Sequence, residues 1–103
     1  IPWGAPDDLN TFMAMVNNVP TDWVRSAFSI GRNQMNYVAA TVLSGGHIRV
    51  GLEDNIWLQK GVLATNAQLV ERAATIATNM GSTLMTPAQV RELIKVEKRA
   101  PLA

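Results

Sequence analysis

The sequence contains no cysteine, and this absence excludes two kinds of site. Without thiols the chain can form neither a disulfide framework nor a thiolate metal centre, which fits an intracellular protein. Histidine is scarce as well, because His47 is the single one. A catalytic zinc ion commonly takes three protein ligands, typically including histidines. The residues of this chain alone therefore cannot complete such a site.

The sequence also lacks an excess of charge of one sign and any long apolar run. Nine Lys and Arg residues against eight Asp and Glu residues leave a formal net charge of +1. No basic run is interleaved with aromatic residues, so nucleic acid is set aside as a partner. No apolar run approaches the length of a membrane span, and the first residues, IPWGAPDD, lack the regions of a signal peptide. We therefore expect a soluble, cytoplasmic protein.

An initiator methionine is missing too, and Ile1–Gly4 is typical of a loop. The 103 residues suffice for one small domain, and a hydrophobic content of 48% is ordinary for a globular protein. From its opening residues we nevertheless expect the chain to be cut from a longer one.

What is present is an alternation of helical and strand-like segments. Asp7 or Asp8 can cap a first helix, which Asn17–Pro20 ends. The run Trp23–Ile30 is rich in aromatic and β-branched residues and predicts a strand. A second helix starts at about Asn33 and is closed by two glycines. The apolar faces of these two helices are Leu9, Phe12, Met13 and Val16, and Met35, Val38, Ala39, Val42 and Leu43.

The segment Gly45–Asn55, GGHIRVGLEDN, places two kinds of side chain on two faces of one predicted strand. Alternate residues form an apolar row, Ile48, Val50 and Leu52, and a polar row, His47, Arg49, Gly51 and Glu53. Between helical segments, such a strand should bury its apolar row and point its polar row into a site. It ends in adjacent carboxylates, Glu53 and Asp54. With Arg49 they form a set that can grip and deprotonate an oxyanion substrate near a metal.

Two further helices follow. The third spans Asn66–Met80 and stops at Gly81, and its apolar positions are Leu69, Val70, Ala73, Ala74, Ile76, Ala77 and Met80. The fourth is announced by Thr86 as the cap, Pro87 in the first turn and Gln89, which can complete a capping box. Its apolar face is Val90, Leu93 and Ile94. We expect the tail, residues 97–103, to fray.

The order of these elements predicts a parallel α/β architecture. Two strands alone cannot form a stable parallel sheet, because each leaves an edge and a face uncovered. A complete eight-fold barrel needs about 250 residues. Residues 1–103 are therefore interpreted as the C-terminal part of a TIM (β/α)8 barrel, incomplete on its own: the last two to three βα units and a C-terminal helix.

The stretch SIGRNQMNYVAATVLSGGHIRVGLEDNIWLQKGVLATNAQLVERA, from Ser29 to Ala73, resembles the C-terminal part of the β-keto acid cleavage enzyme family. The run GGHIRVGLEDN, followed by a G-V-L-A turn, is long and contiguous and makes the signal specific. The resemblance extends from Trp3 to the helix after Thr86. The first two thirds of the family's chain have no counterpart here.

The resemblance implies a metal-dependent barrel enzyme, usually containing zinc and tending toward homotetramers. Such enzymes convert a β-keto acid and acetyl-CoA into acetoacetate and a new acyl-CoA. At matching positions, the resemblance implies that Glu53 is a metal ligand and that Asp54 is a base. It implies that Arg49 orients Asp54 or holds the carboxylate of the keto acid. The family's histidine ligands lie on an early strand, outside this sequence.

Each of these residues also has a structural interpretation. Glu53 and Asp54 can be a solvated pair at a strand end, and Arg49 can pair with Glu53 across one face and tie up both groups. The place of the carboxylates at the C-terminal end of a predicted parallel strand, beside Gly51, favours function. His47 starts the strand, away from that end. We expect it to pack or cap rather than to bind metal.

A second candidate site is the turn between the first strand and its helix, Gly31–Asn33. Backbone amides at a helix N-terminus lie there beside Arg32, which suits a carboxylate or phosphate. Gly31 and Arg32 are therefore candidate substrate or coenzyme A ligands, with a surface role for Arg32 equally open. Trp3 and Gly4 can wall the same pocket, although a buried structural tryptophan is an equal alternative.

The alternative function is a small non-catalytic α/β module that binds an anionic ligand at the Gly31 turn. The coding sequence upstream of Ile1 discriminates between the two. About 170 to 200 further residues with a closely spaced histidine pair would favour the barrel enzyme, since barrels run about 250 residues or longer. A start codon just before Ile1 would favour the module.

Overall fold

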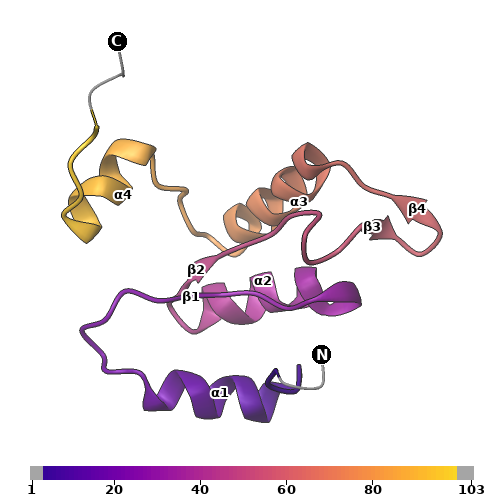
Figure 1. The fold of residues 1–103 in the computed structure, drawn as a ribbon, viewed down its shortest axis with the longest axis horizontal. Helices are drawn as coiled ribbons and strands as arrows, with labels where there is room; N and C mark the ends of the chain where they lie inside the picture. Colours follow the sequence, from indigo (N-terminus) through magenta and orange to yellow (C-terminus); the bar gives the residue numbers. More distant parts are fainter. Residues whose placement is uncertain (1–3, 100–103) are drawn as a thin grey trace.

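The computed structural model describes residues 4–99, which form a mixed α/β structure (Figure 1). Its elements are α1 (Leu9–Asn18), β1 (Ser26–Ala27), the 3-10 helix η1 (Gly31–Asn33), α2 (Gln34–Leu43), β2 (His47–Ile48), β3 (Trp57–Gln59), β4 (Val62–Leu63), α3 (Asn66–Asn79) and α4 (Pro87–Ile94). The predicted succession of helix, strand, helix, strand, helix and helix is confirmed. A hairpin of β3 and β4 is added to it.

The strands β1 and β2 are parallel neighbours joined by α2. Ser26 lies opposite His47 and Ala27 opposite Ile48. The helix α2 packs against both strands and against α3, so it lies at the centre of the structure (Figure 1). A parallel pair requires such a crossover connection, and its presence confirms the predicted α/β alternation.

The helix ends are fixed by the residues that the sequence singles out. Of the two candidate caps of α1, Asp8 is the one used, because its Oδ1 accepts a hydrogen bond from the Thr11 amide at 2.8 Å. Capping boxes formed by Thr65 with Gln68 and by Thr86 with Gln89 start α3 and α4.

At the C-terminal end of α2, Gly45 adopts a φ of 84°, a left-handed conformation that favours glycine. This lets the Gly46 amide donate to the Thr41 carbonyl at 2.9 Å and the Gly45 amide to the Val42 carbonyl at 3.1 Å. The two bonds form a Schellman motif, which satisfies carbonyls at the end of the helix.

The core lies on two sides of α2, where it packs against α3 and where its Tyr37 meets α1. Phe12 of α1 packs edge-on against Tyr37 of α2, with ring centroids 5.3 Å apart, and the Tyr37 hydroxyl donates to the Asp8 carbonyl at 3.1 Å. Burial raises the pKa of the Tyr37 hydroxyl, and the charges of Asp7 and Asp8 add to the increase. The buried hydrophobic residues of the described chain are Phe12, Tyr37, Val38, Leu69, Ala73 and Ala77.

Both predicted strands are shorter than the sequence pattern suggests. Of Trp23–Ile30, only Ser26–Ala27 pairs in a ladder, and Trp23 is exposed. Of the HIRVGLE segment, only His47–Ile48 pairs, so Leu52 leaves the predicted apolar row and lies exposed in the turn that follows. Each strand has a single neighbour within residues 4–99, and a ladder cannot extend without partners.

The buried face of α2 also differs from the prediction. Gln34, Tyr37, Val38 and Thr41 are buried, whereas Leu43 is 83% exposed. The reason is tertiary: the Gln34 amide reaches the carbonyl of Gly51, and Thr41 packs beside Gly46. Polar residues therefore occupy two inward positions that hydrophobic periodicity assigns to apolar ones. On α3, Val70 and Met80 are likewise exposed.

The hairpin of β3 and β4 was not predicted. Its antiparallel strands pair Trp57 with Leu63, and Gly61 in the connecting turn has a φ of 78°. The Lys60-Gly61 pair between short runs of strand-forming residues is the signal in the sequence. Asn55 fastens the start of the hairpin, because its side chain both donates to the Trp57 carbonyl and accepts from the Trp57 amide.

The amino-terminal end of the β1–β2 pair is closed by Arg25. Its guanidinium donates to the carbonyl of Ser44, at the C-terminal end of α2, and lies directly over Gly46. The Arg25 carbonyl also accepts from the His47 amide at 2.9 Å, so one residue joins β1, α2 and β2. A cation at this place complements the negative end of the helix dipole.

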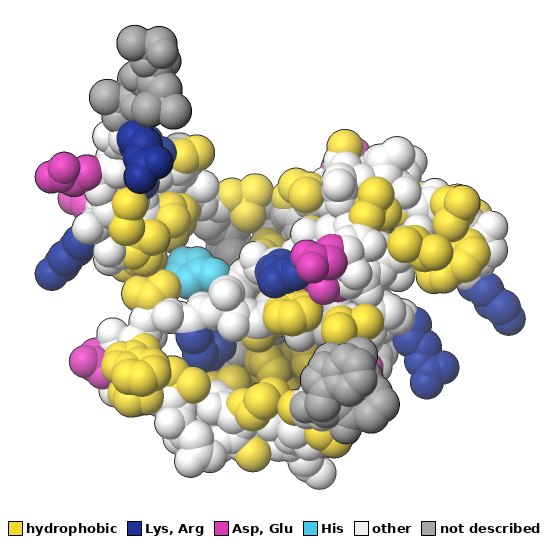
Figure 2. All heavy atoms as spheres, in the orientation of Figure 1, with side chains coloured by type: hydrophobic (Ala, Val, Ile, Leu, Met, Phe, Trp, Pro, Cys, Tyr) yellow, Lys and Arg dark blue, Asp and Glu magenta, His cyan; other side chains and the backbone are white. Residues whose placement is uncertain are grey.

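Many large apolar side chains remain exposed. Figure 2 shows hydrophobic side chains spread over much of the face in view. Exposed ones occur on α1, on the β3–β4 hairpin and on α4, including Leu9, Leu63 and Leu93. Between residues 4 and 99, no helix has the length and apolar character needed to cross a bilayer. Trp3 and residues 100–103 of the predicted tail lie outside the described residues.

Replacing Thr65 by alanine should destabilise the protein by about 1 kcal/mol, because the hydroxyl that accepts from the Gln68 amide is lost. Chemical denaturation measures the change in the free energy of unfolding. The matched control is Thr75→Ala within α3. Its hydroxyl bonds only the Glu71 carbonyl of the preceding turn, and alanine favours the helix. If Thr65→Ala and Thr75→Ala lower the free energy of unfolding equally, the hydroxyl of Thr65 does not act as a cap.

Asp8 should make the stability of α1 sensitive to acid. The hydrogen bond from the Thr11 amide, reinforced by the Thr11 hydroxyl, holds the pKa of Asp8 below its ordinary value of 3.8. A lowered folded-state pKa gives stability that is fully present above pH 3.8 and is lost as the pH falls through the folded-state value. Asp8→Asn keeps an acceptor but does not titrate. Its melting temperature should therefore fall less between pH 5 and pH 2 than that of the parent.

The contrasting variant Asp8→Ala should be less stable than the parent at neutral pH, because it removes the acceptor altogether. An Asp8→Asn protein with the same acid profile as the parent would show that this carboxylate does not carry the effect.

Candidate functional site

The candidate site lies in the turn that follows β2. The carbonyl of Gly51 accepts hydrogen bonds from the amides of Asp54 at 3.2 Å and Asn55 at 3.1 Å, and from the Gln34 side chain at 3.1 Å. The Asp54 carbonyl accepts from the Gly31 amide at 2.6 Å. These bonds fasten the turn to η1 and α2, so the end of β2 lies beside the end of β1.

The turn sends two adjacent carboxylates into different surroundings. The Glu53 side chain is 84% exposed, whereas that of Asp54 is 6% exposed. Both carboxylates reach the same guanidinium, that of Arg49, but only Asp54 is covered by the rest of the structure. The two groups are therefore not an equivalent solvated pair.

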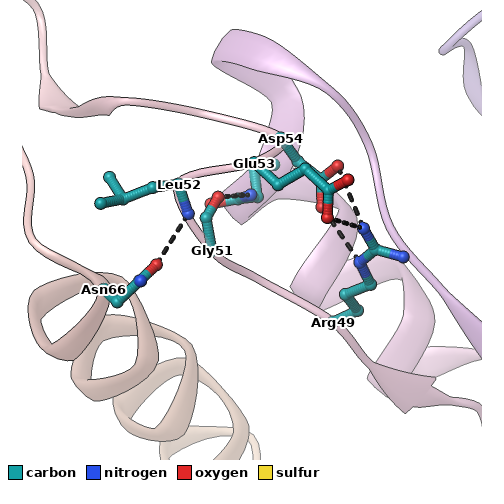
Figure 3. Close-up of polar contacts among 7 residues, drawn as sticks. Arg49, Gly51, Leu52, Glu53, Asp54 and Asn66 are labelled. Atoms are coloured by element: carbon teal, nitrogen blue, oxygen red, sulfur yellow. Dashed lines mark hydrogen bonds and ion pairs between the residues drawn. The ribbon is translucent and has the colours of Figure 1, made fainter.

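Arg49 contacts both carboxylates. Its Nε lies 3.1 Å from Oδ2 of Asp54, and its Nη2 lies 2.9 Å from Oε2 of Glu53 and 3.5 Å from Oδ1 of Asp54 (Figure 3). One edge of the guanidinium is thus occupied. Nη1, on the other edge, has no hydrogen-bond partner among residues 4–99, and the side chain is 47% exposed. This cation can take an anionic ligand without leaving Asp54.

Phe28 supports the guanidinium from one face. The Cζ atom of Arg49 lies 4.4 Å from the centroid of the Phe28 ring, a cation–π distance. Phe28 directly follows β1, and the Arg49 amide donates to the Ala27 carbonyl at 3.3 Å. The parallel pairing of the strands therefore sets the stacking. Sequence reasoning missed Phe28, because nothing in its own segment indicates a partner on another strand.

The predicted structural pair of Arg49 with Glu53 is present, and it leaves Glu53 available. An exposed ion pair contributes about 0–1 kcal/mol, so a stronger ligand can displace the arginine from this carboxylate. Oε1 of Glu53 has no hydrogen bond within the described chain. The oxygen donor suits a divalent cation such as zinc.

Residues 4–99 hold no group of three or more His, Cys, Asp or Glu side chains that could hold a metal ion. Glu53 can therefore supply one donor, and a complete metal centre needs ligands from elsewhere. His47 does not help, because it begins β2 at the end away from Glu53. Its side chain is exposed, so of the two expected structural roles, packing and capping, the structure does not show packing.

The Gly31 turn lies beside Asp54 but is partly occupied. Gly31 has a φ of 79°, and its amide is taken by the Asp54 carbonyl. Asp7 lies at the same turn and accepts from the Asn33 side chain at 2.7 Å, which places a negative charge near it. Arg32 is exposed and points a cation to solvent. The turn thus offers fewer free amides than the sequence suggests.

Comparison with known proteins bears on the chemistry of this site. The family model described as beta-keto acid cleavage enzyme matches residues 1–96. The chain is 65% identical over 99 residues to the 3-dehydrocarnitine:acetyl-CoA trimethylamine transferase of Rhizobium meliloti (strain 1021). The match covers 96% of this chain and 33% of that protein.

Two further relatives are more distant. The chain is 35% identical over 85 residues to the 3-keto-5-aminohexanoate cleavage enzyme of Acetoanaerobium sticklandii, covering 82% of this chain and 31% of that protein. It is 34% identical over 80 residues to the 3,5-dioxohexanoate:acetyl-CoA acetone transferase of Paraburkholderia graminis. That match covers 77% of this chain and 26% of that protein. This chain spans about a third or less of the length of these curated relatives.

The resemblance inferred from GGHIRVGLEDN is thereby confirmed. The chain belongs to the β-keto acid cleavage enzyme family.

Proposed function

We propose that the protein containing this chain is a metal-dependent enzyme that condenses a β-keto acid with acetyl-CoA to give acetoacetate and a new acyl-CoA. The observation that carries the proposal is the Arg49 guanidinium, which contacts a buried and an exposed carboxylate and keeps one edge open. The names of relatives, which include acetyl-CoA transferases and keto acid cleavage enzymes, support the same chemistry.

We further propose that the chain forms the C-terminal part of a TIM (β/α)8 barrel. Three observations support this placement: the parallel β1–α2–β2 unit, the uncovered outer edges of both strands within residues 4–99, and the coverage of about a third of related chains. In barrels the active site lies at the C-terminal ends of the strands. Glu53 and Asp54 follow β2 at that end, and Phe28 follows β1.

Glu53 is proposed to bind the metal, most simply a zinc ion, through its exposed carboxylate. The remaining ligands come from outside the described residues. A divalent metal polarises carbonyl oxygens and stabilises developing negative charge when it is bound. A metal held by Glu53 would lie next to Asp54 in the sequence, and Arg49 holds the Glu53 carboxylate in place through Oε2.

Arg49 is proposed to hold the carboxylate of the keto acid through its free Nη1 edge. A guanidinium recognises a carboxylate by parallel hydrogen bonds and also stabilises an enolate, since its charge is fixed in place before the reaction. The Phe28 ring and the two carboxylates orient this group. Asp54 then faces the carbon between the carboxylate and the ketone.

Asp54 is proposed to remove the acidic proton from that carbon. The resulting carbanion attacks the thioester carbonyl of acetyl-CoA, and coenzyme A leaves as the thiolate. The thiolate attacks the original ketone, and the carbon–carbon bond breaks to give a new acyl-CoA. The enolate of acetoacetate takes the proton back from Asp54. Each bond that forms is matched by one that breaks, so no other reactant is required.

Arg32 and Gly31 are proposed to contact the substrate or coenzyme A at the neighbouring turn. The exposed Arg32 cation supports this location, and the bond from the Gly31 amide to the Asp54 carbonyl places the turn beside the proposed base. Because Asp7 places a carboxylate close by, Arg32 is the group that we expect to attract the anion.

Replacing Asp54 by asparagine in the full-length enzyme should lower kcat by roughly 10²- to 10⁴-fold, because the base is lost while the shape is kept. Acetyl-CoA-dependent formation of acetoacetate provides the measurement. The matched control is Asp22→Asn, an exposed carboxylate before β1, which should keep parental turnover. Unchanged turnover in Asp54→Asn would rule out the assigned base.

Replacing Glu53 by glutamine should reduce the affinity for metal by more than the roughly 10- to 100-fold that loss of an outer-shell partner costs. Metal content after dialysis, measured by elemental analysis, tests this in the full-length enzyme. Glu71→Gln on the exposed face of α3 is the control and should retain parental metal content. A Glu53→Gln protein with full metal content would refute the ligand assignment.

A further inference from the structure

The turn that carries the two carboxylates is held on its other side by Asn66. Its Oδ1 accepts a hydrogen bond from the Leu52 amide at 2.8 Å (Figure 3). A Cβ added to Gly51 would be in ordinary van der Waals contact with the same oxygen, at 3.4 Å. Gln34 and Gly31 hold the turn from the α2 side, so Asn66 completes the support from the α3 side.

Asn66 is the first residue of α3, yet the cap of this helix does not use its side chain. Thr65 and Gln68 form the capping box between themselves. The side-chain oxygen of Asn66 is therefore committed to the turn. The helix that carries it is fixed by the buried residues Leu69, Ala73 and Ala77, so the acceptor stands on a rigid element.

The Leu52 amide is a sensitive place for such support, because it precedes Glu53 and Asp54. Rotation of the peptide between Gly51 and Leu52 would change the direction of both carboxylates relative to the guanidinium of Arg49. The two ion pairs, at 2.9 and 3.1 Å, leave little room for this rotation. Displacements of about 1 Å in a reacting group can cost on the order of 10²-fold in rate.

We propose that Asn66 is a positioning residue of the enzyme: it fixes the peptide of Leu52 and so sets the separation of the outward Glu53 from the inward Asp54. This inference rests on the proposed function, because the turn matters for catalysis only if it carries the metal ligand and the base. Asn66 itself touches neither the substrate nor the metal.

The test uses the full-length enzyme and three variants. Asn66→Ala removes the acceptor, Asn66→Asp keeps an acceptor oxygen at the same reach, and Asn79→Ala changes the same residue type at the far end of α3. Hydrogen exchange of the Leu52 amide, kcat, KM and the melting temperature are measured for each, with metal at saturation. Asp54→Asn serves as the reference for the loss of the base.

In Asn66→Ala we expect faster exchange at Leu52 and a kcat lowered by roughly tenfold, with KM and melting temperature close to the parent. Asn66→Asp should restore slow exchange and most of kcat, and Asn79→Ala should match the parent throughout. A purely structural role would lower the melting temperature and would not produce a kcat loss that the acceptor rescues.

If Asn66→Ala exchanges the Leu52 amide faster but keeps the parental kcat, the role of Asn66 is overturned. Unchanged exchange at Leu52 in this variant would overturn it too. In both cases Asp54→Asn would still show the loss of turnover that marks the proposed function. A loss of kcat that Asn66→Asp does not restore would also overturn it. If Asp54→Asn keeps full turnover, the proposed function itself fails, which is a different result from a failure at Asn66 alone.

Discussion

The conformation of the chain after β2 depends on the hydrogen bonds that the carbonyl oxygen of Gly51 accepts. Three donors converge on it: two backbone amides of the following turn and the side-chain amide of a buried glutamine on α2. Each such bond contributes about 0.5–1.5 kcal/mol net, and a buried partner left without it costs more. Together they reverse the chain directly after the strand. The reversal brings Arg49 back toward the carboxylates that follow it in the sequence.

Much of the fold could be predicted because its boundaries are set by local chemistry. Asp8, Thr65 and Thr86 each satisfy amides within the next turn, and Gly45 adopts a conformation that other residues rarely do. Strand length and the inward face of α2 could not be predicted, since both depend on neighbours that are distant in sequence. Gln34 illustrates this: its burial is explained only by the Gly51 carbonyl.

The candidate site, like the fold, could be predicted where it depends on residues that are close in sequence. Arg49, Glu53 and Asp54 lie within six positions of one another, so their proximity follows from the sequence alone. Their unequal exposure does not, because it arises from the turn and its supports. Phe28 and Asn66 contribute from other elements, and no periodicity or spacing connects them with the carboxylates. The resemblance to a family assigned roles, but it did not indicate what holds the groups in place.

Arg25 and Gly46 have a consequence for how this sequence can vary. The guanidinium of Arg25 occupies the space into which any side chain at position 46 would project, and it does so while bonding the end of α2. The two positions are therefore coupled. An alanine at 46 would make the end of the Arg25 side chain move, and the carbonyl of Ser44 at the end of the helix would then lose its bond to the guanidinium. Covariation between these two positions is thus expected among related sequences that share this strand pairing.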